Sequence, residues 1–250
     1  MLKGGIMEDG LVKASEKGTP QGSILSPLLS NIYLHYVLDL WFSRRIKEQC
    51  RGEAYYFRFA DDFLACFQFK GDAEHFRNCL SDRLEVFGLE LAGEKTRCIE
   101  FGRFARENAR KNGEKPKEFT FLGFTHYCGK TKEGYFKVKR RTSRKKFGQS
   151  ISKFKDWAQR SRSLLRKVEM LRQAKVRVIG HLGYYAITDN SARCSSYLYY
   201  VRRILFKWLN RKSQRVTYTW EGYQQALNWV GWPKPNIRKD LNPFRSLKAI

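Results

Sequence analysis

The chain has 250 residues, 42% of them hydrophobic, which is enough for one large domain or two ordinary ones with a buried core. Lysine and arginine number 49 against 24 aspartate and glutamate residues, a formal net charge of +25 that exceeds what solubility requires. Such a charge attracts polyanions, with nucleic acid as the first candidate and a basic architectural protein as the alternative. An anionic membrane surface ranks lower, because the basic helices also carry core-like aromatic residues.

The cysteines and the apolar runs indicate the compartment. None of the six cysteines forms a CxxC pair, which favours reduced thiols over a zinc site or a disulfide framework. No apolar run approaches the ~20 residues of a membrane span, and the N-terminus has no apolar signal-like core. We therefore expect a cytoplasmic protein with no membrane partner.

The first predicted element is a helix over residues 26–48, preceded by a loop rich in glycine and proline. The stretch GTPQGSILSPLLSNIYL covers residues 18–34, and Ser26 suits a helix cap with Pro27 as the first helical residue. Apolar pairs then recur every four residues. Glycines let a backbone approach a ligand closely and Gln21 offers a two-sided amide, so the loop suits a templated base pair. The alternative is a plain helix entry loop.

Two strands, residues 55–60 and 63–69, are predicted to form a hairpin with Asp61 and Asp62 at its tip. Taken alone, adjacent aspartates in a turn are more often turn formers, since aspartate caps backbone amides there. Two carboxylates fixed at a tip also suit divalent ions. Nucleotidyl transfer uses two such ions, and Mg²⁺ takes a few carboxylates while keeping its waters.

The region after the hairpin alternates between predicted helix and strand. Asp72 is expected to cap a helix that Gly88 ends. Residues 103–118 read as a polar, basic connection. Strands are predicted at residues 89–91, 98–101, 119–124 and 135–139.

The pattern changes to helices near residue 138, so we predict an α+β part, residues 1–137, followed by an all-α part, residues 138–250. Residues 137–177 hold 16 lysines and arginines against two acids. No helix needs this imbalance to fold, so a bound anion is favoured over a merely solvated basic face. The predicted RNA-binding residues are Arg140, Arg141, Arg144, Lys145 and Lys146.

The ordered motifs of the chain resemble the second half of the palm of a reverse transcriptase of the group II intron type, an antiparallel sheet with packed helices. The later helices resemble the thumb, or maturase X domain, of the same proteins. The palm-like motifs are LKGGIMEDG, GTPQGSILSPLLSNIYL, YFRFADDF, LELAGEKT and FTFLGF; the thumb-like ones are GHLGYYAITDN, LFKWLNRKSQR and TYTWEGYQQAL.

The resemblance implies an RNA-directed DNA polymerase that acts on an RNA template, a DNA primer and deoxynucleoside triphosphates. Asp61 and Asp62 would bind Mg²⁺ or Mn²⁺, and Lys95 would lie near the triphosphate. For Lys95 the alternative is a surface charge, and for Phe124 it is plain core packing. The other implied residues are a nucleotide pocket of Gln21, Gly22, Phe59 and Ala60 and a primer grip of Leu122, Gly123 and Phe124.

The chain departs from the resembling family in two ways. Phe59 stands where the family usually has the tyrosine of YADD, and its ring still supplies packing surface. The fingers and the first aspartate motif, which the family places upstream of the PQG loop, have no counterpart. We therefore expect an N-terminally truncated fragment, which a separate polypeptide carrying fingers and palm would complete.

Three functions follow as hypotheses. The first is the polymerase itself. The second is a non-catalytic maturase module that binds structured intron RNA and assists splicing, for which basic and aromatic side chains are suited. The third is a decayed reading frame without a selected function.

Overall fold

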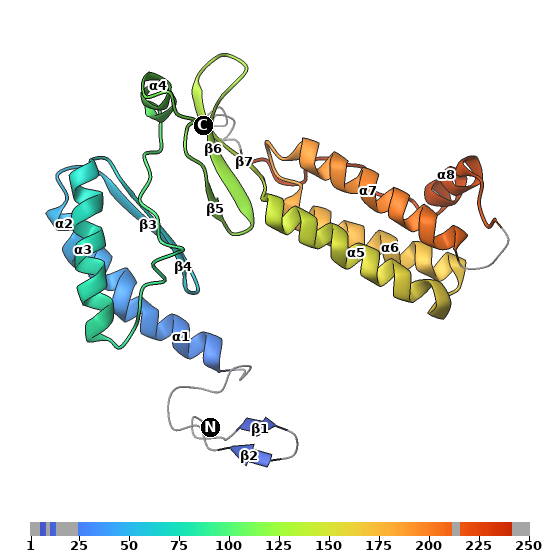
Figure 1. Cartoon of the computed structure of the whole chain (residues 1–250), viewed down its shortest axis with the longest axis horizontal. Coiled ribbons are helices and arrows are strands. Elements are labelled where there is room, and N and C mark those ends of the chain that lie inside the picture. Colours follow the sequence, from blue (N-terminus) through green and yellow to red (C-terminus); the bar gives the residue numbers. More distant parts are fainter. Residues whose placement is uncertain (1–5, 9–10, 14–24, 212–215, 242–250) are drawn as a thin grey trace, which may run out of the picture. The chain divides into compact units, whose positions relative to one another are not determined.

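The protein is described by a computed structural model that covers residues 6–8, 11–13, 25–211 and 216–241 (Figure 1). Short antiparallel strand pairs alternate with helices, and the last part is helical, so the predicted α+β class is confirmed. The first strand pair, β1 (Ile6–Glu8) with β2 (Leu11–Lys13), is antiparallel.

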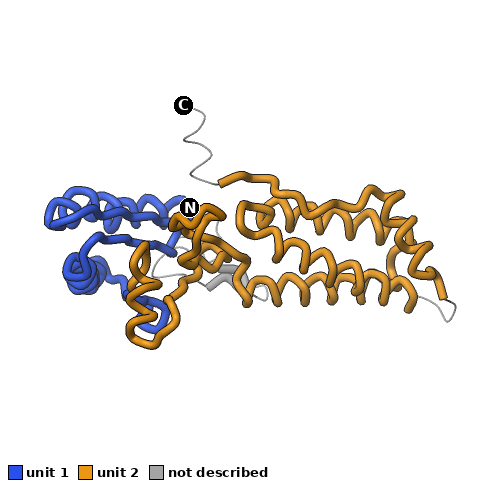
Figure 2. Tube along the Cα trace, turned by 90° about the horizontal axis from the view of Figure 1, so that it is seen from above, with its two compact units in different colours: residues 1–99 blue, residues 100–250 orange. Residues whose placement is uncertain are grey.

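The chain divides into two compact units, Met1–Ile99 and Glu100–Ile250, coloured separately in Figure 2. The second unit contains a three-stranded sheet as well as the helical bundle. The predicted boundary near residue 138 falls inside the last strand of that sheet, shortly before the bundle begins. The assignment of residues 1–137 and 138–250 to two functional domains stays a prediction.

One helical region runs from Ser26 to Gln49, close to the predicted 26–48. It consists of α1 (Ser26–Leu34), the π-helical segments η1 (His35–Asp39) and η2 (Phe42–Ile46), and α2 (Lys47–Gln49). Leu25 is the N-cap, so Ser26 lies one position inside the helix rather than capping it. An apolar repeat of four exceeds the 3.6 residues of an α-turn, and the wider π-turns keep apolar side chains on one face. The buried residues on that face are Val37, Leu38, Phe42 and Ile46.

The predicted hairpin is confirmed as β3 (Ala54–Phe59) paired antiparallel with β4 (Asp62–Phe67). Its inward-facing residues pack on the helical region and on α3 (Lys70–Val86), mainly through aromatic and aliphatic side chains. Phe42 stacks on Tyr56 with ring centroids 5.0 Å apart, and Phe67 lies 5.2 Å from Phe76. This aromatic core fixes the hairpin against the helices.

The prediction that Asp72 caps α3 is wrong. The helix begins at Lys70, and the buried Asp72 carboxylate instead accepts hydrogen bonds from the backbone N–H of Arg51 (3.1 Å) and of Gly52 (3.4 Å). Its side chain thereby ties the entry of β3 to α3. The helix end is as predicted, since Gly88 adopts φ 64° and follows Val86 by two residues.

Two of the predicted strands are absent from the structure. Residues 89–91 and 98–101 belong to no strand of the described chain. The predicted connection at 103–118 contains a short helix, α4 (Ala105–Lys111), with Ala105 buried. Apolar runs of three or four residues do not distinguish strand from packed coil.

The second unit begins with a sheet of order β5–β6–β7, formed by β5 (Phe119–Phe121), β6 (Phe124–Lys130) and β7 (Phe136–Thr142). The predicted strand at 119–124 is therefore a hairpin whose turn is Leu122 and Gly123. The strand at 135–139 and its hairpin with the preceding residues are confirmed.

The helical bundle packs α5 (Arg144–Leu164), α6 (Lys167–Tyr185) and α7 (Ser191–Asn210) side by side, with α8 (Trp220–Trp229) near the end of α7 (Figure 1). One continuous core joins them. None of the described helices is both long and apolar enough to cross a bilayer. The fully buried side chains of this core include Met170, Leu171, Val178, Leu182, Val201, Leu205, Leu209 and Tyr223.

Two buried polar contacts join the sheet to this bundle. Asn190 is fully buried; its side-chain oxygen accepts from the Thr142 N–H, and its amide donates to Thr142 Oγ1 and to the Tyr185 carbonyl, each at 2.8 Å. Lys137 forms an ion pair with Asp189 at 3.0 Å. Because these contacts are buried, they fix the arrangement of the sheet on the bundle.

Candidate active site on the β3–β4 hairpin

The tip of the β3–β4 hairpin carries the two predicted catalytic aspartates. Phe59 pairs with Asp62, which leaves Ala60 and Asp61 as a two-residue loop. Ala60 adopts φ 54°, the left-handed conformation that turns matching the strand twist require at their first central residue. Both aspartates are exposed to solvent. The turn therefore presents two adjacent carboxylates outside the aromatic core.

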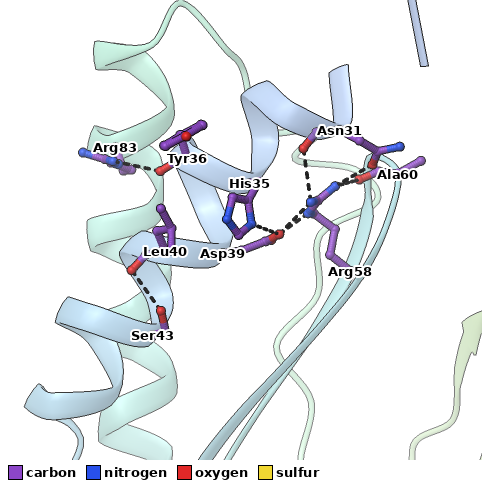
Figure 3. A network of polar contacts seen from close by, with 9 residues as sticks. All are labelled: Asn31, His35, Tyr36, Asp39, Leu40, Ser43, Arg58, Ala60 and Arg83. Atoms are coloured by element: carbon purple, nitrogen blue, oxygen red, sulfur yellow. Dashed lines mark hydrogen bonds and ion pairs between the residues drawn. The ribbon is translucent and has the colours of Figure 1, made fainter. Parts of the chain in front are cut away.

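A forked hydrogen-bond network holds this tip on the helical region (Figure 3). Arg58 donates from Nε and Nη2 to the two carboxylate oxygens of Asp39, at 2.7 and 2.6 Å. Its Nη1 donates to the side-chain oxygen of Asn31 at 3.0 Å and to the Ala60 carbonyl at 2.9 Å. One guanidinium thus joins the loop beside Asp61 to the helical region, and we name these four residues the Arg58 clamp.

Within the Arg58 clamp, Asp39 and Arg58 each stabilise the charged form of the other. The hydrogen bond from Arg58 holds the pKa of the Asp39 carboxyl below its usual value, against the opposing effect of burial, and His35 adds a contact at 3.2 Å. The same hydrogen bond raises the pKa of Arg58. Since both donor edges of Arg58 are used by the clamp, its positive charge is directed to Asp39 rather than to Asp61 and Asp62.

An aromatic surface adjoins Asp62 on the face of the hairpin turned away from the core. Tyr55, Phe57 and Phe59 alternate along β3 and are 51%, 53% and 63% exposed. Asp62 lies opposite Phe59 in the register, and directly paired residues share a face. Exposed rings next to carboxylates suit the sugar or base of a nucleotide.

The two aspartates fit a hard divalent cation as part of a site. Mg²⁺ is commonly held by one or two carboxylates, with waters and substrate phosphates as its other ligands. In the described part of the chain, no group of three or more histidine, cysteine or acidic residues could hold a metal ion. Asp61 and Asp62 would therefore supply oxygen donors for one ion, and a second ion would need a further carboxylate.

The turn between β5 and β6 contains the predicted primer grip. Leu122 and Gly123 both have positive φ, 49° and 79°, which is costly for leucine. The Leu122 carbonyl accepts from the Tyr184 hydroxyl at 2.8 Å, and Phe124 stacks on the Tyr184 ring with centroids 5.5 Å apart. A Cβ on Gly123 would lie 3.1 Å from the Tyr185 hydroxyl. Helix α6 therefore holds this strained turn in place.

Residues 7–126 match the reverse transcriptase family. The family is that of RNA-dependent DNA polymerases, and the matched segment includes both the hairpin tip and the turn at Leu122 and Gly123. The helices α5 to α8 lie outside it. A search of curated proteins found no match for the chain. The match supports RNA-directed DNA polymerisation as the general kind of activity.

The other predicted residues of the reverse transcriptase site are only partly placed. Gln21 and Gly22 lie outside the described residues. Lys95 lies in a turn after α3, where its backbone N–H donates to the Ala92 carbonyl at 3.0 Å. Its side chain is exposed, and within the described ranges no ion pair joins it to either aspartate. Its predicted role near a triphosphate stays a prediction.

The predicted RNA-binding residues fall into two groups. Arg141 is paired with Glu118 at 2.6 Å, and Arg140 donates to the Leu241 carbonyl at 3.0 Å, so both have partners within the fold. Arg144, Lys145 and Lys146 are exposed in the first turn of α5 and pair with no acid in the described chain. This second group is available to an anion.

The Arg58 clamp was not predicted from the sequence. Ala54, Tyr56 and Arg58 alternate on the inward face of β3, and a charged residue at an inward position requires a buried partner. Asp39 is the one acidic residue between positions 17 and 47 of the sequence. The combination of an inward arginine with this lone acid was the available signal.

Proposed function

We propose that the chain acts as an RNA-directed DNA polymerase of the group II intron type, extending a DNA primer on an RNA template. The observation that carries the proposal is the hairpin tip, where Asp61 and Asp62 are exposed while the Arg58 clamp fixes the turn beside them. The match of residues 7–126 to the reverse transcriptase family supports the reaction class. The intron type rests on the motif resemblance.

Each element has a separate task in this proposal. Asp61 and Asp62 would hold Mg²⁺, or Mn²⁺, which when bound stabilises negative charge on the transferred phosphate and lowers the pKa of the attacking hydroxyl. The exposed ring of Phe59 would support the incoming nucleotide, and the turn at Leu122 and Gly123 would position the primer end. Because Tyr184 and Phe124 brace that turn, the primer would meet a rigid support.

Primer extension tests the proposal. With only two carboxylates at the tip, we expect the chain alone to incorporate little or no nucleotide on an RNA template with Mg²⁺. Addition of a polypeptide that carries reverse transcriptase fingers and a further palm aspartate should give extension that requires Mg²⁺. Robust extension by the chain alone would contradict the two-carboxylate argument, and no extension in the mixture would contradict the polymerase proposal.

The start of α5 favours RNA binding as a second candidate function, that of a maturase module. Ser143 caps the helix, and the next three residues are Arg144, Lys145 and Lys146. Cations in a first turn meet the positive end of the helix dipole, which disfavours them by roughly 0.3–1 kcal/mol each. An RNA phosphate at the same place would be favoured by the dipole, the free N–H groups and the side chains together.

Changing Arg144, Lys145 and Lys146 together to glutamine is expected to weaken RNA binding, because each contact to a phosphate contributes through counterion release. The slope of log K against log salt should become less steep by about 2 for single-stranded RNA if all three residues contact phosphate. Fluorescence anisotropy at several salt concentrations measures both quantities. Unchanged affinity and slope would place the RNA elsewhere; circular dichroism checks that α5 remains folded.

A further inference from the structure

A groove in the second unit lies between α4 and the β6–β7 hairpin. It encloses about 1010 Å³. One wall is formed by α4 and the residues leading into it, and the other by the end of β6 and the start of β7. The residues that line the groove include Arg103, Arg106, Glu107, Arg110, Lys130 and Tyr135. None of them belongs to the site described above.

Four cations face this groove against one acid. Arg106 and Arg110 are four residues apart on α4, ~6 Å along its axis, and Arg103 lies in the turn that leads into the helix. All three arginines are exposed, and none forms an ion pair in the described part of the chain. Folding gains nothing from placing like charges at this spacing, so the row favours an anionic ligand.

The walls of the groove are fixed to each other. The Cys128 thiol on β6 donates to the Gly102 carbonyl at 3.4 Å, and Ala105 at the start of α4 is buried. Phe101 packs edge-on against Phe119 of β5 with centroids 4.9 Å apart. The arginine row is therefore attached to the sheet rather than carried on a free segment, and the groove exists before a ligand binds.

Tyr135 adds an aromatic surface to the basic wall. Tyr135 directly precedes β7, is 68% exposed, and lies across the groove from α4. A small anion such as phosphate would use the guanidinium groups but would leave this ring in water. A polyanion with flat bases would use both, because unpaired bases stack on aromatic rings while arginines contact the backbone.

We propose that the groove binds a single-stranded segment of RNA, with successive phosphates on Arg103, Arg106 and Arg110 and a base stacked on Tyr135. The identification of the polyanion as RNA rests on the proposed function, whereas the preference for a single strand rests on the exposed ring. The site is separate from the basic turn of α5, so the two would contact different parts of one RNA.

The experiment compares two variants of the full chain with equal changes of charge. One carries Arg103→Gln, Arg106→Gln and Arg110→Gln; the control carries Lys47→Gln, Lys70→Gln and Arg77→Gln, all exposed positions of the first unit. The probes are a single-stranded RNA, the same sequence as DNA, and a duplex RNA. Affinity is measured by fluorescence anisotropy between about 50 and 200 mM salt.

We expect the groove variant to bind single-stranded RNA at least about tenfold more weakly, with a salt slope less steep by about 2. The control should change the slope less, and duplex RNA should be less affected than the single strand. Equal losses in both variants, or a larger loss for the duplex, would overturn the proposal. Equal loss for RNA and DNA would keep the groove as a single-strand site while removing its preference for RNA.

Tyr135 provides an independent test of stacking. Tyr135→Ala should weaken single-stranded RNA binding about tenfold without changing the salt slope, and Tyr135→Phe should restore it, because only the ring is needed. An unchanged affinity in Tyr135→Ala would overturn the stacking role. If the unmodified chain binds no nucleic acid, the proposed function fails; if it binds and only the groove variants are unaffected, the groove inference fails alone.

Discussion

Replacing Asp61 and Asp62 together by asparagine is expected to lower primer extension, measured in the mixture that supplies the further carboxylate, by at least about 10³-fold. Metal ions contribute several kcal/mol of charge stabilisation to such reactions, and ~4 kcal/mol corresponds to about this factor. The affinity for RNA should stay the same or rise slightly, because two negative charges are removed from an exposed tip. The expected effect is thus on turnover rather than on binding.

A matched control separates metal binding from general charge. Asp82→Asn with Glu85→Gln removes the same charge from the exposed side of α3 and should leave extension unchanged. A second readout does not depend on activity. Fe²⁺ substituted for Mg²⁺, with hydrogen peroxide as oxidant and ascorbate to recycle the iron, should direct oxidative cleavage of the backbone near residues 59–63, and the double variant should lose this cleavage. Extension or cleavage that persists in the double variant would show that these carboxylates do not bind the ion.

The hairpin tip could be predicted from the sequence because its determinants are local. Strand-forming residues alternate on both sides of Asp61 and Asp62, and a two-residue connection leaves the register no freedom. The helix over 26–48 was equally well marked, although its π-turns were not predicted. A repeat of four apolar positions indicates a helix without stating how far its turns are widened.

The features that escaped prediction depend on partners distant in sequence. Asp72 had the residue type of a helix cap but accepts hydrogen bonds from Arg51 and Gly52 instead. The segment 98–101 looked extended, yet in the described chain it finds no strand to pair with. The sequence predicts only a polar connection where α4 carries its arginine row, because only the fold brings the row opposite Tyr135. In each case a tertiary contact decided the outcome.

The Arg58 clamp is the clearest such case, and its removal is the second large effect that we expect. Arg58→Gln should lower the free energy of unfolding by about 2–3 kcal/mol, because the Asp39 carboxylate would lose its forked partner. This is below the 3–5 kcal/mol of a fully buried pair, since the side chain of Asp39 is 28% exposed and that of Arg58 is 10% exposed. Urea denaturation of the two proteins measures the difference.

The clamp also predicts how this stability depends on pH. Asp39 has its ordinary pKa of 3.8 when unfolded and a lower pKa when folded, so the unfolded chain binds a proton more readily. The stabilisation that Asp39 gains from Arg58 is present at a pH above the unfolded pKa of 3.8, and it is lost as the pH falls through the folded pKa. The acid limb of a stability curve should therefore be less steep for Arg58→Gln than for the unmodified chain.

A positioning role for Arg58 requires an effect on turnover beyond the loss of stability. The Ala60 carbonyl would lose its donor, so the loop carrying Asp61 would be free to move, and supporting contacts of this kind are worth about 10–100-fold in metal sites. In the mixture that supplies the further carboxylate, we expect kcat to fall by that factor at a temperature where both proteins are folded, with KM for the nucleotide little changed. Arg58→Lys keeps the charge but cannot reach Asp39, Asn31 and Ala60 at once, so it should restore stability better than turnover. If lysine restores both equally, the clamp acts through charge alone and the fork does not position the carboxylates.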